Sequence, residues 1–287
     1  MKSVGVIGSG VMGSGIALLF LQNGFKVTLV DHDPENLHKA ATYINYSLDS
    51  LVAKSRLDKK KRTGMVLKFS TSPHVAAVQD CDLVIEAVPE KTELKLKIFK
   101  ELDEMCKTDA ILASNTSSIS ITKIAGATKR PEKVIGLHFM NPAPVMKLVE
   151  VVSGMKTAPE LVKKMTSLLA SIGKQAVHVN DAPGFVTNRL LIPMINEAVY
   201  ILQEGVAKKE DIDSIARLGF NHPMGPLELA DFIGLDVCLD IMERLHEDLG
   251  DDKYRPCSML REMVDAGFLG RKTGQGFYKY KNGTRRD

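Results

Sequence analysis

Cysteine is scarce in this chain of 287 residues. The four cysteines lie far apart, with no Cys-x-x-Cys pair and no histidine at the spacing of a metal ligand; they are Cys81, Cys106, Cys238 and Cys257. This pattern argues against a disulfide framework and against a zinc site. We therefore expect a reducing compartment and no bound metal.

An excess of one charge and long apolar runs are lacking as well. The formal net charge is only +3 at pH 7, which is too small to predict binding to nucleic acid or to a membrane surface. No apolar run approaches the length of a membrane span, and the first strand pattern follows Met1 too closely to leave room for a signal or transit peptide. The sequence predicts a cytoplasmic protein, unless it is the mature form of an imported one.

The composition itself is that of an ordinary globular protein, with 44% hydrophobic and 25% charged residues. A chain of 287 residues exceeds one typical domain and falls short of three, so two domains are expected. No internal repeat or low-complexity segment interrupts it.

The first two-thirds of the chain have the pattern of a largely parallel sheet with helices on both faces. Short runs rich in Val, Ile and Leu alternate there with helical stretches. The predicted strands are Val4–Ile7, Val27–Val30, Leu83–Glu86, Ile111–Ala113, Val134–His138, Leu148–Val152 and Ala176–Val179.

Beyond Pro183-Gly184 the pattern changes to amphipathic helices without strand runs. The last residues, Lys281–Asp287, are mostly charged and are expected to fray. We therefore predict an α/β domain of the Rossmann type, with a doubly wound and largely parallel sheet, over residues 1–183, and a smaller all-α domain over residues 184–287. The predicted helices of the second domain are Phe185–Gln203, Glu210–Leu218, Leu227–Ile233 and Asp236–Leu249.

A G-x-G-x-x-G motif follows the first predicted strand and opens a helical pattern. In this context its first glycine permits a tight turn, its second lets a pyrophosphate approach the backbone, and its third lets the helix pack on the strand. The helix N-terminus favours the negative charge of the ligand. A flexible strand-to-helix turn is the alternative. The predicted contacts with a dinucleotide are Gly8, Gly10, Val11, Met12 and Gly13.

Asp31 ends the second predicted strand, a little over twenty residues beyond Gly8. A carboxylate at this place accepts hydrogen bonds from an adenosine ribose and repels a 2′-phosphate, which favours NAD over NADP. An acid after a strand is often only a helix cap, and Asp33 before Pro34 is a competing cap. The motif and Asp31 together predict NAD as the cofactor.

Five further motifs, in this order and spacing, are similar to those of the 3-hydroxyacyl-CoA dehydrogenase family, and most of all to the bacterial 3-hydroxybutyryl-CoA dehydrogenases. The similarity runs nearly end to end, which makes it far more specific than any one motif. The motifs are Ser114-Asn-Thr-Ser117-Ser118, the stretch from His138 to Glu150, Pro183-Gly184-Phe185-Val-Thr-Asn188-Arg189, His222-Pro-Met-Gly-Pro226, and the stretch from Gly270 to Tyr278.

His138 and Glu150 are the predicted acid–base pair. They lie on successive predicted strands joined through a Pro-rich turn, so neighbouring strands can bring their side chains together. An imidazole exchanges a proton with a hydroxyl near neutral pH, and a carboxylate fixes its tautomer and stabilises its charged form. A His and a Glu taken alone favour ordinary structural roles. The resemblance favours catalysis, because the family's catalytic dyad corresponds to these two positions.

The resemblance implies further site residues. Ser117 and Asn188 correspond to residues that hydrogen-bond the substrate oxygen, and Ser117 also to a cofactor contact. Without the resemblance, each of these implied site residues could equally be a turn residue, a polar residue of a helix, or a charged residue exposed to solvent. The implied cofactor contacts are Glu90, Lys95, Asn141 and Lys272, and the implied contacts to coenzyme A are Ser47 and Lys54, with the basic run Lys59–Arg62 nearby.

The resemblance implies an NAD-dependent enzyme that interconverts (S)-3-hydroxyacyl-CoA and 3-ketoacyl-CoA thioesters, and it favours short chains. The resemblance also implies a homodimer formed through the helical domain. Two alternatives stay open, a dehydrogenase of a free hydroxy acid and a non-catalytic NAD-binding protein on the same scaffold. Acyl chain length, physiological direction and pathway do not follow from the sequence.

Overall fold

The structure is a computed structural model, and it describes residues 1–286. Its contacts divide the chain into two compact units, Met1–Ala182 and Pro183–Asp287, which we call the N-terminal unit and the C-terminal unit. The division falls next to the Pro183-Gly184 segment at which the sequence pattern changes.

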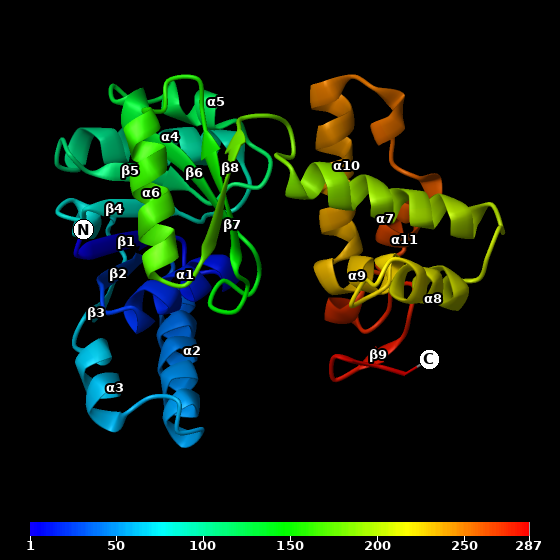
Figure 1. Cartoon of the computed structure of the whole chain (residues 1–287), viewed down its shortest axis with the longest axis horizontal. Helices are drawn as coiled ribbons and strands as arrows, with labels where there is room; N and C mark the ends of the chain where they lie inside the picture. Colours follow the sequence, from blue (N-terminus) through cyan, green and yellow to red (C-terminus); the bar gives the residue numbers. More distant parts are fainter. Residues whose placement is uncertain (287) are drawn as a thin grey trace. The chain divides into compact units, whose positions relative to one another are not determined.

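The N-terminal unit is built on one eight-stranded sheet (Figure 1). Neighbouring strands run parallel, except for β6 and β7, which pair antiparallel. The predicted Rossmann-type, largely parallel sheet is thereby confirmed. In spatial order the strands are β3 (Phe69–Ser72), β2 (Lys26–Val30), β1 (Ser3–Ile7), β4 (Leu83–Glu86), β5 (Ile111–Ser114), β6 (Val134–Phe139), β7 (Leu148–Ser153) and β8 (Gln175–Asn180).

Helices cover both faces of this sheet. Buried residues of α1, α2 and α6 share one core with the sheet. The helix α5 lies on the opposite face, where a Cβ added to Gly136 of β6 would meet the side chain of Ile121 at 2.9 Å. The helices are α1 (Val11–Gln22), α2 (Pro34–Ala53), α3 (Lys59–Val66), α4 (Thr92–Met105), α5 (Ile121–Ala125) and α6 (Pro159–Ser171), with short 3-10 turns at Val75–Val78 and Pro131–Lys133.

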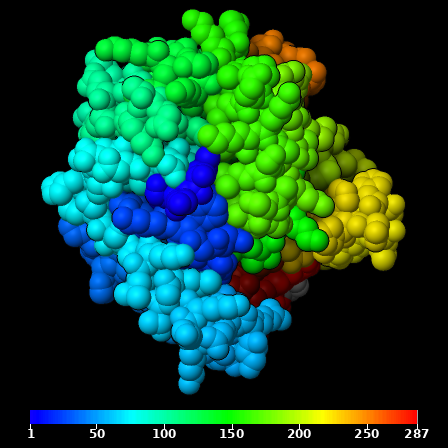
Figure 2. All heavy atoms as spheres, turned by 60° about the vertical axis from the view of Figure 1, so that its left-hand side comes forward, coloured from blue at the N-terminus to red at the C-terminus, as the bar shows by residue number. Residues whose placement is uncertain are grey.

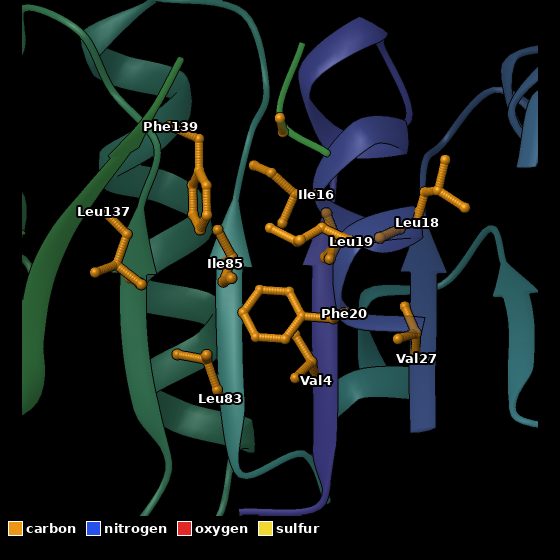
Figure 3. Close-up of a cluster of buried hydrophobic side chains, with 14 of the residues drawn as sticks. Val4, Ile16, Leu18, Leu19, Phe20, Val27, Leu83, Ile85, Leu137 and Phe139 are labelled. Carbon is orange, nitrogen blue, oxygen red and sulfur yellow. The ribbon is translucent and has the colours of Figure 1, made fainter. Parts of the chain in front are cut away.

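The packing of α1 fixes the position of the glycine motif. Figure 3 shows Phe20 of α1 lying against Val4 of β1 and against Leu83 and Ile85 of β4. The Phe20 ring also meets the edge of Phe139, with 6.5 Å between the ring centroids and an interplanar angle of 74°. Burial of one such side chain contributes about 1.5–3 kcal/mol. The helix is therefore held on β1 and β4, and the loop between β1 and α1 is held with it.

The predicted set of strands lacks β3. This strand has the sequence Phe-Ser-Thr-Ser and lies at the edge of the sheet, so its middle side chains are exposed. An edge strand with so little apolar material leaves no hydrophobic pattern in the sequence.

The C-terminal unit is mainly helical, which confirms the helical second part of the predicted fold. Its buried residues form a core of their own. The expectation of no strands there is wrong, because a short antiparallel pair, β9 (Tyr280–Lys281) and β10 (Thr284–Arg285), closes the chain. The helices are α7 (Thr187–Gln203), α8 (Lys209–Gly219), α9 (Pro226–Ile233), α10 (Leu235–Leu249) and α11 (Ser258–Asp265), with 3-10 turns at Asp252–Tyr254 and Arg271–Thr273.

The expectation of a frayed tail is also wrong as far as residue 286; Asp287 lies outside the described residues. The guanidinium of Arg285 lies 3.4 Å from the centroid of the Tyr278 ring. The Tyr280 hydroxyl donates to the buried Asp231 carboxylate at 3.0 Å. Contacts to aromatic rings and to a buried carboxylate thus order a segment whose composition alone suggests a solvated end.

Membrane and metal features can be assessed for residues 1–286. Over this range, no helix combines the length and the apolar character that a membrane crossing requires. In the same part of the chain, no group of His, Cys, Asp and Glu side chains is arranged to hold a metal ion. The four cysteines are buried free thiols.

Candidate active site

The glycine motif lies where the sheet order reverses, since β1 has β2 on one side and β4 on the other. Gly8 has a φ of +100°, and a Cβ there would lie 2.6 Å from the Ala87 carbonyl oxygen. A Cβ on Gly13 would lie 1.8 Å from the Gly8 oxygen, so both glycines are required by packing inside the chain. A Cβ on Gly10 would meet no atom within 4 Å. Its lack of a side chain is therefore not explained by packing, which fits the predicted approach of a pyrophosphate.

Asp31 follows β2 and faces the same loop. Its Oδ2 accepts hydrogen bonds from the Ser9 amide and hydroxyl, both at 2.8 Å, and its Oδ1 accepts from the Asp33 amide at 3.1 Å. Burial raises the pKa of Asp31, but these hydrogen bonds outweigh it and the net pKa is lowered. Asp33 is the residue that caps α2, by accepting from the Glu35 amide at 2.9 Å. Asp31 is thus an ionised group beside the glycine loop and not the cap.

His138 and Glu150 meet across the antiparallel strand pair of the eight-stranded sheet. They are directly opposite in the register of β6 and β7, which places both side chains on the same face. His138 Nδ1 lies 2.7 Å from Glu150 Oε2, and both side chains are largely buried. A carboxylate at this position accepts the Nδ1 proton, which fixes the tautomer that has Nε2 as its acceptor nitrogen. The structure therefore brings these two predicted residues together.

The loop that carries Ser117 follows β5 and is held by Glu90. One oxygen of this carboxylate, Oε1, accepts from the Thr116 hydroxyl at 2.5 Å and from the Ser117 and Ser118 amides at 2.9 and 3.0 Å. Burial raises the pKa of Glu90, whereas the ammonium of Lys95 and the loop donors lower it, with a net value of about 2. Glu90 therefore stays ionised at neutral pH, and it orders the backbone on which Ser117 lies.

Lys95 is fully buried rather than displayed on a helix face. Its Nζ lies 2.5 Å from Glu86 Oε1, 3.2 Å from Glu90 Oε2 and 3.2 Å from the Val88 oxygen. The structure gives this lysine a part in holding Glu90, and direct contact with the cofactor stays a prediction. Glu86, at the end of β4, is not among the predicted site residues. The sequence does contain a signal for Glu86, because an acidic residue stands at the end of a buried strand, as Asp31 does after β2.

Asn141 lies on the exposed turn between β6 and β7, before a cis Asn141-Pro142 bond. The ammonium of Lys174, which is buried, donates to the carbonyl oxygens of Ala143 and Met146 at 2.6 and 2.7 Å. Burial lowers the pKa of Lys174. Lys174 thus fastens the turn that carries Asn141, a role that no sequence motif indicates.

Asn188 and Lys272 belong to the C-terminal unit. Asn188 lies in the first turn of α7. The ammonium of Lys272 lies 2.5 and 2.6 Å from the two oxygens of Asp236, which is the second residue of α10. Contacts of these two residues with substrate or cofactor stay predictions.

Ser47 and Lys54 lie on and just beyond α2, seven residues apart, and so share one side of the helix. The adjoining α3 begins at the basic run and forms an exposed lobe in the space-filling view (Figure 2). Within this run, Arg62 is engaged by Asp49 of α2, with 3.0 Å from Nε to Oδ1. Arg62 therefore joins α3 to α2, whereas Lys59, Lys60 and Lys61 are exposed.

Comparison with known proteins identifies the family. Residues 3–182 match the model of the 3-hydroxyacyl-CoA dehydrogenase NAD binding domain, and residues 184–280 match that of the 3-hydroxyacyl-CoA dehydrogenase C-terminal domain. The chain belongs to the 3-hydroxyacyl-CoA dehydrogenase family. It is an NAD-dependent oxidoreductase, which confirms the predicted cofactor and enzyme class.

Relatives of this dehydrogenase match it over nearly its whole length. The probable 3-hydroxybutyryl-CoA dehydrogenase of Bacillus subtilis is 50% identical over 284 residues, which cover 99% of each chain. The mitochondrial hydroxyacyl-coenzyme A dehydrogenase of Homo sapiens is 41% identical over 289 residues, covering 98% of this chain and 92% of that one. The crystal structure of (S)-3-hydroxybutyryl-CoA dehydrogenase PaaH1 from Ralstonia eutropha has a TM-score of 0.94 at 44% identity, covering 98% of this chain and 100% of that one.

In this 3-hydroxyacyl-CoA dehydrogenase, Asp181 is a further residue that sequence motifs do not reveal. It follows β8, and its carboxylate accepts from the Ser120 hydroxyl at 2.7 Å and from the Thr122 amide at 2.8 Å. These bonds attach the end of the N-terminal unit to the start of α5, directly after the loop of Ser117. Asp181 and Glu90 therefore hold this loop segment at its two ends.

Proposed function

We propose that this dehydrogenase interconverts (S)-3-hydroxybutyryl-CoA and acetoacetyl-CoA. The observation that carries the proposal is the His138–Glu150 pair, with 2.7 Å between Nδ1 and Oε2, on strands of a domain that matches the family's NAD binding model. The short-chain substrate is supported by the names of the relatives in Bacillus subtilis and Ralstonia eutropha.

His138 is the acid and base in this proposal. During oxidation, Nε2 removes the proton of the C3 hydroxyl, and during reduction the same nitrogen returns it. Glu150 accepts the Nδ1 hydrogen bond throughout and stabilises the positive charge that develops on the ring. The near burial of both side chains strengthens this charge interaction, since water screens it little.

NAD, when bound, supplies the hydride acceptor at its nicotinamide ring. Gly8, Gly10 and the amides that open α1 are suited to its pyrophosphate, and the ionised Asp31 to its adenosine ribose. Val11, Met12 and Gly13 complete the glycine loop. Further predicted contacts are Glu90, Lys95, Ser117, Asn141 and Lys272.

Substrate recognition is assigned to two groups of residues. Ser117 and Asn188 hydrogen-bond the oxygen at C3, which steadies it without adding charge. Ser47 and Lys54 bind the coenzyme A portion, and the exposed lysines of α3 add attraction for its phosphates.

The assembly and location of the enzyme complete the proposal. We assign the cofactor to residues 1–183, and part of the substrate site together with the contacts of a homodimer to residues 184–287. Exposed apolar side chains on and after α8, among them Leu218 and Phe220, support a protein contact there. The buried free thiols fit a cytoplasmic enzyme.

Oxidation of NADH in the presence of acetoacetyl-CoA tests the function, with free acetoacetate as the comparison substrate. The proposal expects turnover of the thioester at a kcat/KM at least about a hundredfold above that of the free acid, because the coenzyme A contacts contribute binding energy. Equal use of both substrates would favour a free-acid dehydrogenase. No turnover of either would favour a non-catalytic NAD-binding protein.

A further inference from the structure

Glu86 is a fully buried carboxylate to which the proposed function gives no role. It ends β4, next to Ala87, whose carbonyl oxygen packs against Gly8 of the glycine loop. Burial raises the pKa of Glu86. Removing a carboxylate from water costs several kcal/mol unless close partners compensate, so its partners decide what it does.

Three groups hold this carboxylate. Oε1 lies 2.5 Å from the ammonium of Lys95 and accepts from the Val88 amide at 2.7 Å, and Oε2 accepts from the Ser114 hydroxyl at 2.7 Å. The Lys95 ammonium has two other oxygen neighbours, Glu90 Oε2 at 3.2 Å and the Val88 oxygen at 3.2 Å. The three N–H donors of a lysine thus face three oxygens, and the shortest distance is to Glu86.

The two oxygens of Glu90 consequently face different partners. Oε1 accepts from Thr116, Ser117 and Ser118, whereas Oε2 faces Lys95. The ion pair of Lys95 with Glu86 is shorter than its ion pair with Glu90, so Glu86 draws the ammonium toward itself. Without the charge of Glu86, Glu90 is the charged partner that Lys95 keeps, and the ammonium then competes with the loop donors for the same carboxylate.

We propose that Glu86 is a positioning residue for Ser117: it holds Lys95 at a distance from Glu90 that leaves Glu90 Oε1 to order the Thr116–Ser118 loop. The inference deepens the proposed function and rests on the role of Ser117 in it. Glu86 itself is fully buried, so it acts through other side chains. Its effect passes from Lys95 to Glu90 and from Glu90 to the backbone of Ser117.

The test replaces Glu86 by Gln, which keeps the size of the side chain and removes its charge. We expect the kcat/KM for acetoacetyl-CoA to fall roughly tenfold or more, because a small displacement of a group that orients the substrate is costly. The dissociation constant of NADH, measured by fluorescence titration, should rise by a smaller factor than kcat/KM falls, because Lys95, Glu90 and Ser117 are also proposed cofactor contacts. A matched control is Arg130→Met, which breaks the partly buried ion pair with Asp103, 2.7 Å between Nε and Oδ1, elsewhere in the N-terminal unit. It should lower the unfolding midpoint and leave kcat/KM unchanged.

Ser117→Ala, made in the wild type and in Glu86→Gln, separates positioning from general stability. If Glu86 acts through Ser117, the loss caused by Ser117→Ala is smaller in the Glu86→Gln enzyme than in the wild type. The inference would be overturned if the losses in kcat/KM caused by Ser117→Ala and by Glu86→Gln simply multiplied in the double variant. It would also be overturned by a Glu86→Gln enzyme that binds NADH poorly but turns over normally. The proposed function is judged separately, by turnover of acetoacetyl-CoA in the wild type.

Glu86→Asp covers the case in which Glu86→Gln does not fold. The aspartate keeps the charge but is one methylene shorter, so it cannot reach Lys95 and Ser114 in the same way. We expect a kcat/KM for acetoacetyl-CoA below that of the wild type. A folded Glu86→Asp enzyme with the kcat/KM of the wild type would contradict the proposed positioning role.

Discussion

The chemistry of His138 depends on which atom each of its ring nitrogens faces. Nδ1 lies against Glu150, and the opposite ring nitrogen is therefore the one that we assign to the substrate. An imidazole without such a partner rotates and changes tautomer, whereas the pair is fixed by a strand register that places the two residues directly opposite each other. Residues that act in this way as one unit lose activity non-additively when they are replaced.

The first prediction concerns this pair. His138→Gln should lower turnover of acetoacetyl-CoA by roughly two to four orders of magnitude, because the titrating imidazole is removed. Glu150→Gln should also slow turnover, and the double variant should be scarcely worse than His138→Gln. The measurement is kcat of the purified variants, with NADH affinity and circular dichroism as checks of the fold.

The matched control is His178→Gln. His178 belongs to β8 of the same sheet, where its Nε2 lies 2.8 Å from the Ser153 hydroxyl near the surface. Its replacement should leave turnover unchanged. Near-normal turnover in a folded His138→Gln enzyme would remove His138 from the proposed mechanism, whereas fully additive losses would break its partnership with Glu150.

A second residue-scale prediction concerns the choice of cofactor. Asp31→Ser removes the carboxylate and its charge, so the KM for NADH should rise by about tenfold to a hundredfold. The difference in kcat/KM between NADH and NADPH should become smaller. Asp33→Ser is the control, because serine still caps α2 and the residue lies only two positions away. The ratio of kcat/KM for NADH and NADPH should change only in Asp31→Ser. A wild-type preference for NADPH would show that the role given to Asp31 is wrong.

Some of these residues could be predicted from the sequence and others could not, for a physical reason. His138 and Glu150 are twelve positions apart on neighbouring strands, so the local pattern allows them to pair, and the family resemblance singles them out. The contacts of Glu86, Lys95 and Glu90 join β4, α4 and the loop after β5, which only the folded sheet brings together. Their burial, and the part that each takes in ordering Ser117, are consequences of tertiary structure that residue type does not reveal.

At the scale of single elements, α2 and α3 form an extension beyond the sheet. Arg62 fastens α3 to Asp49 of α2, and the remaining basic side chains of α3 are exposed. The proposed coenzyme A contacts, Ser47 and Lys54, lie along one side of α2. A helix pair with this arrangement can bind a phosphorylated ligand by charge alone, and such attraction weakens as ionic strength rises.

Lys54→Ala tests this element. The KM for acetoacetyl-CoA should rise by roughly threefold to tenfold while the KM for NADH stays nearly constant, and added salt should reduce the difference between variant and wild type. Lys163→Ala, at an exposed lysine of α6, is the control for loss of one positive charge. Equal effects of Lys54→Ala on both KM values would indicate general destabilisation instead of a coenzyme A contact.

The elements that sequence pattern misses share a feature: they gain their order from contacts distant in the chain. β3 has four residues and one neighbour, and β9 and β10 have two residues each. The last pair is held because Asp231 accepts from the Tyr278 amide and the Tyr280 hydroxyl, at 2.9 and 3.0 Å. Central strands and the longer helices carry their own periodicity, so the pattern of the sequence predicts them, whereas the eight-residue α11 is absent from the predicted helices.

At the scale of the whole molecule, the proposed homodimer makes a prediction about mass. Light scattering on an eluting peak should give twice the mass of the chain. Leu218→Glu combined with Phe220→Ser should raise the dimer dissociation constant at least about tenfold, because these side chains are 87% and 65% exposed in the single chain.

The control for this prediction is Leu67→Glu, at an equally exposed leucine of the N-terminal unit, with an exposure of 83%. It should leave the mass unchanged. A wild type that elutes with the mass of one chain, or a dimer that survives the paired substitution, would contradict a contact through the end of α8.

The reversal of a single strand has a consequence for inheritance and for design. In a wholly parallel sheet, residues on neighbouring strands are separated in the gene by a crossover, but β6 and β7 form one hairpin. The proposed acid–base pair, His138 and Glu150, is therefore encoded by one short contiguous segment. Its register is set by the ladder, so one residue inserted within β7 would turn Glu150 to the opposite face. A recombination event or an engineer that exchanges this segment between related scaffolds therefore exchanges both residues of the proposed pair together.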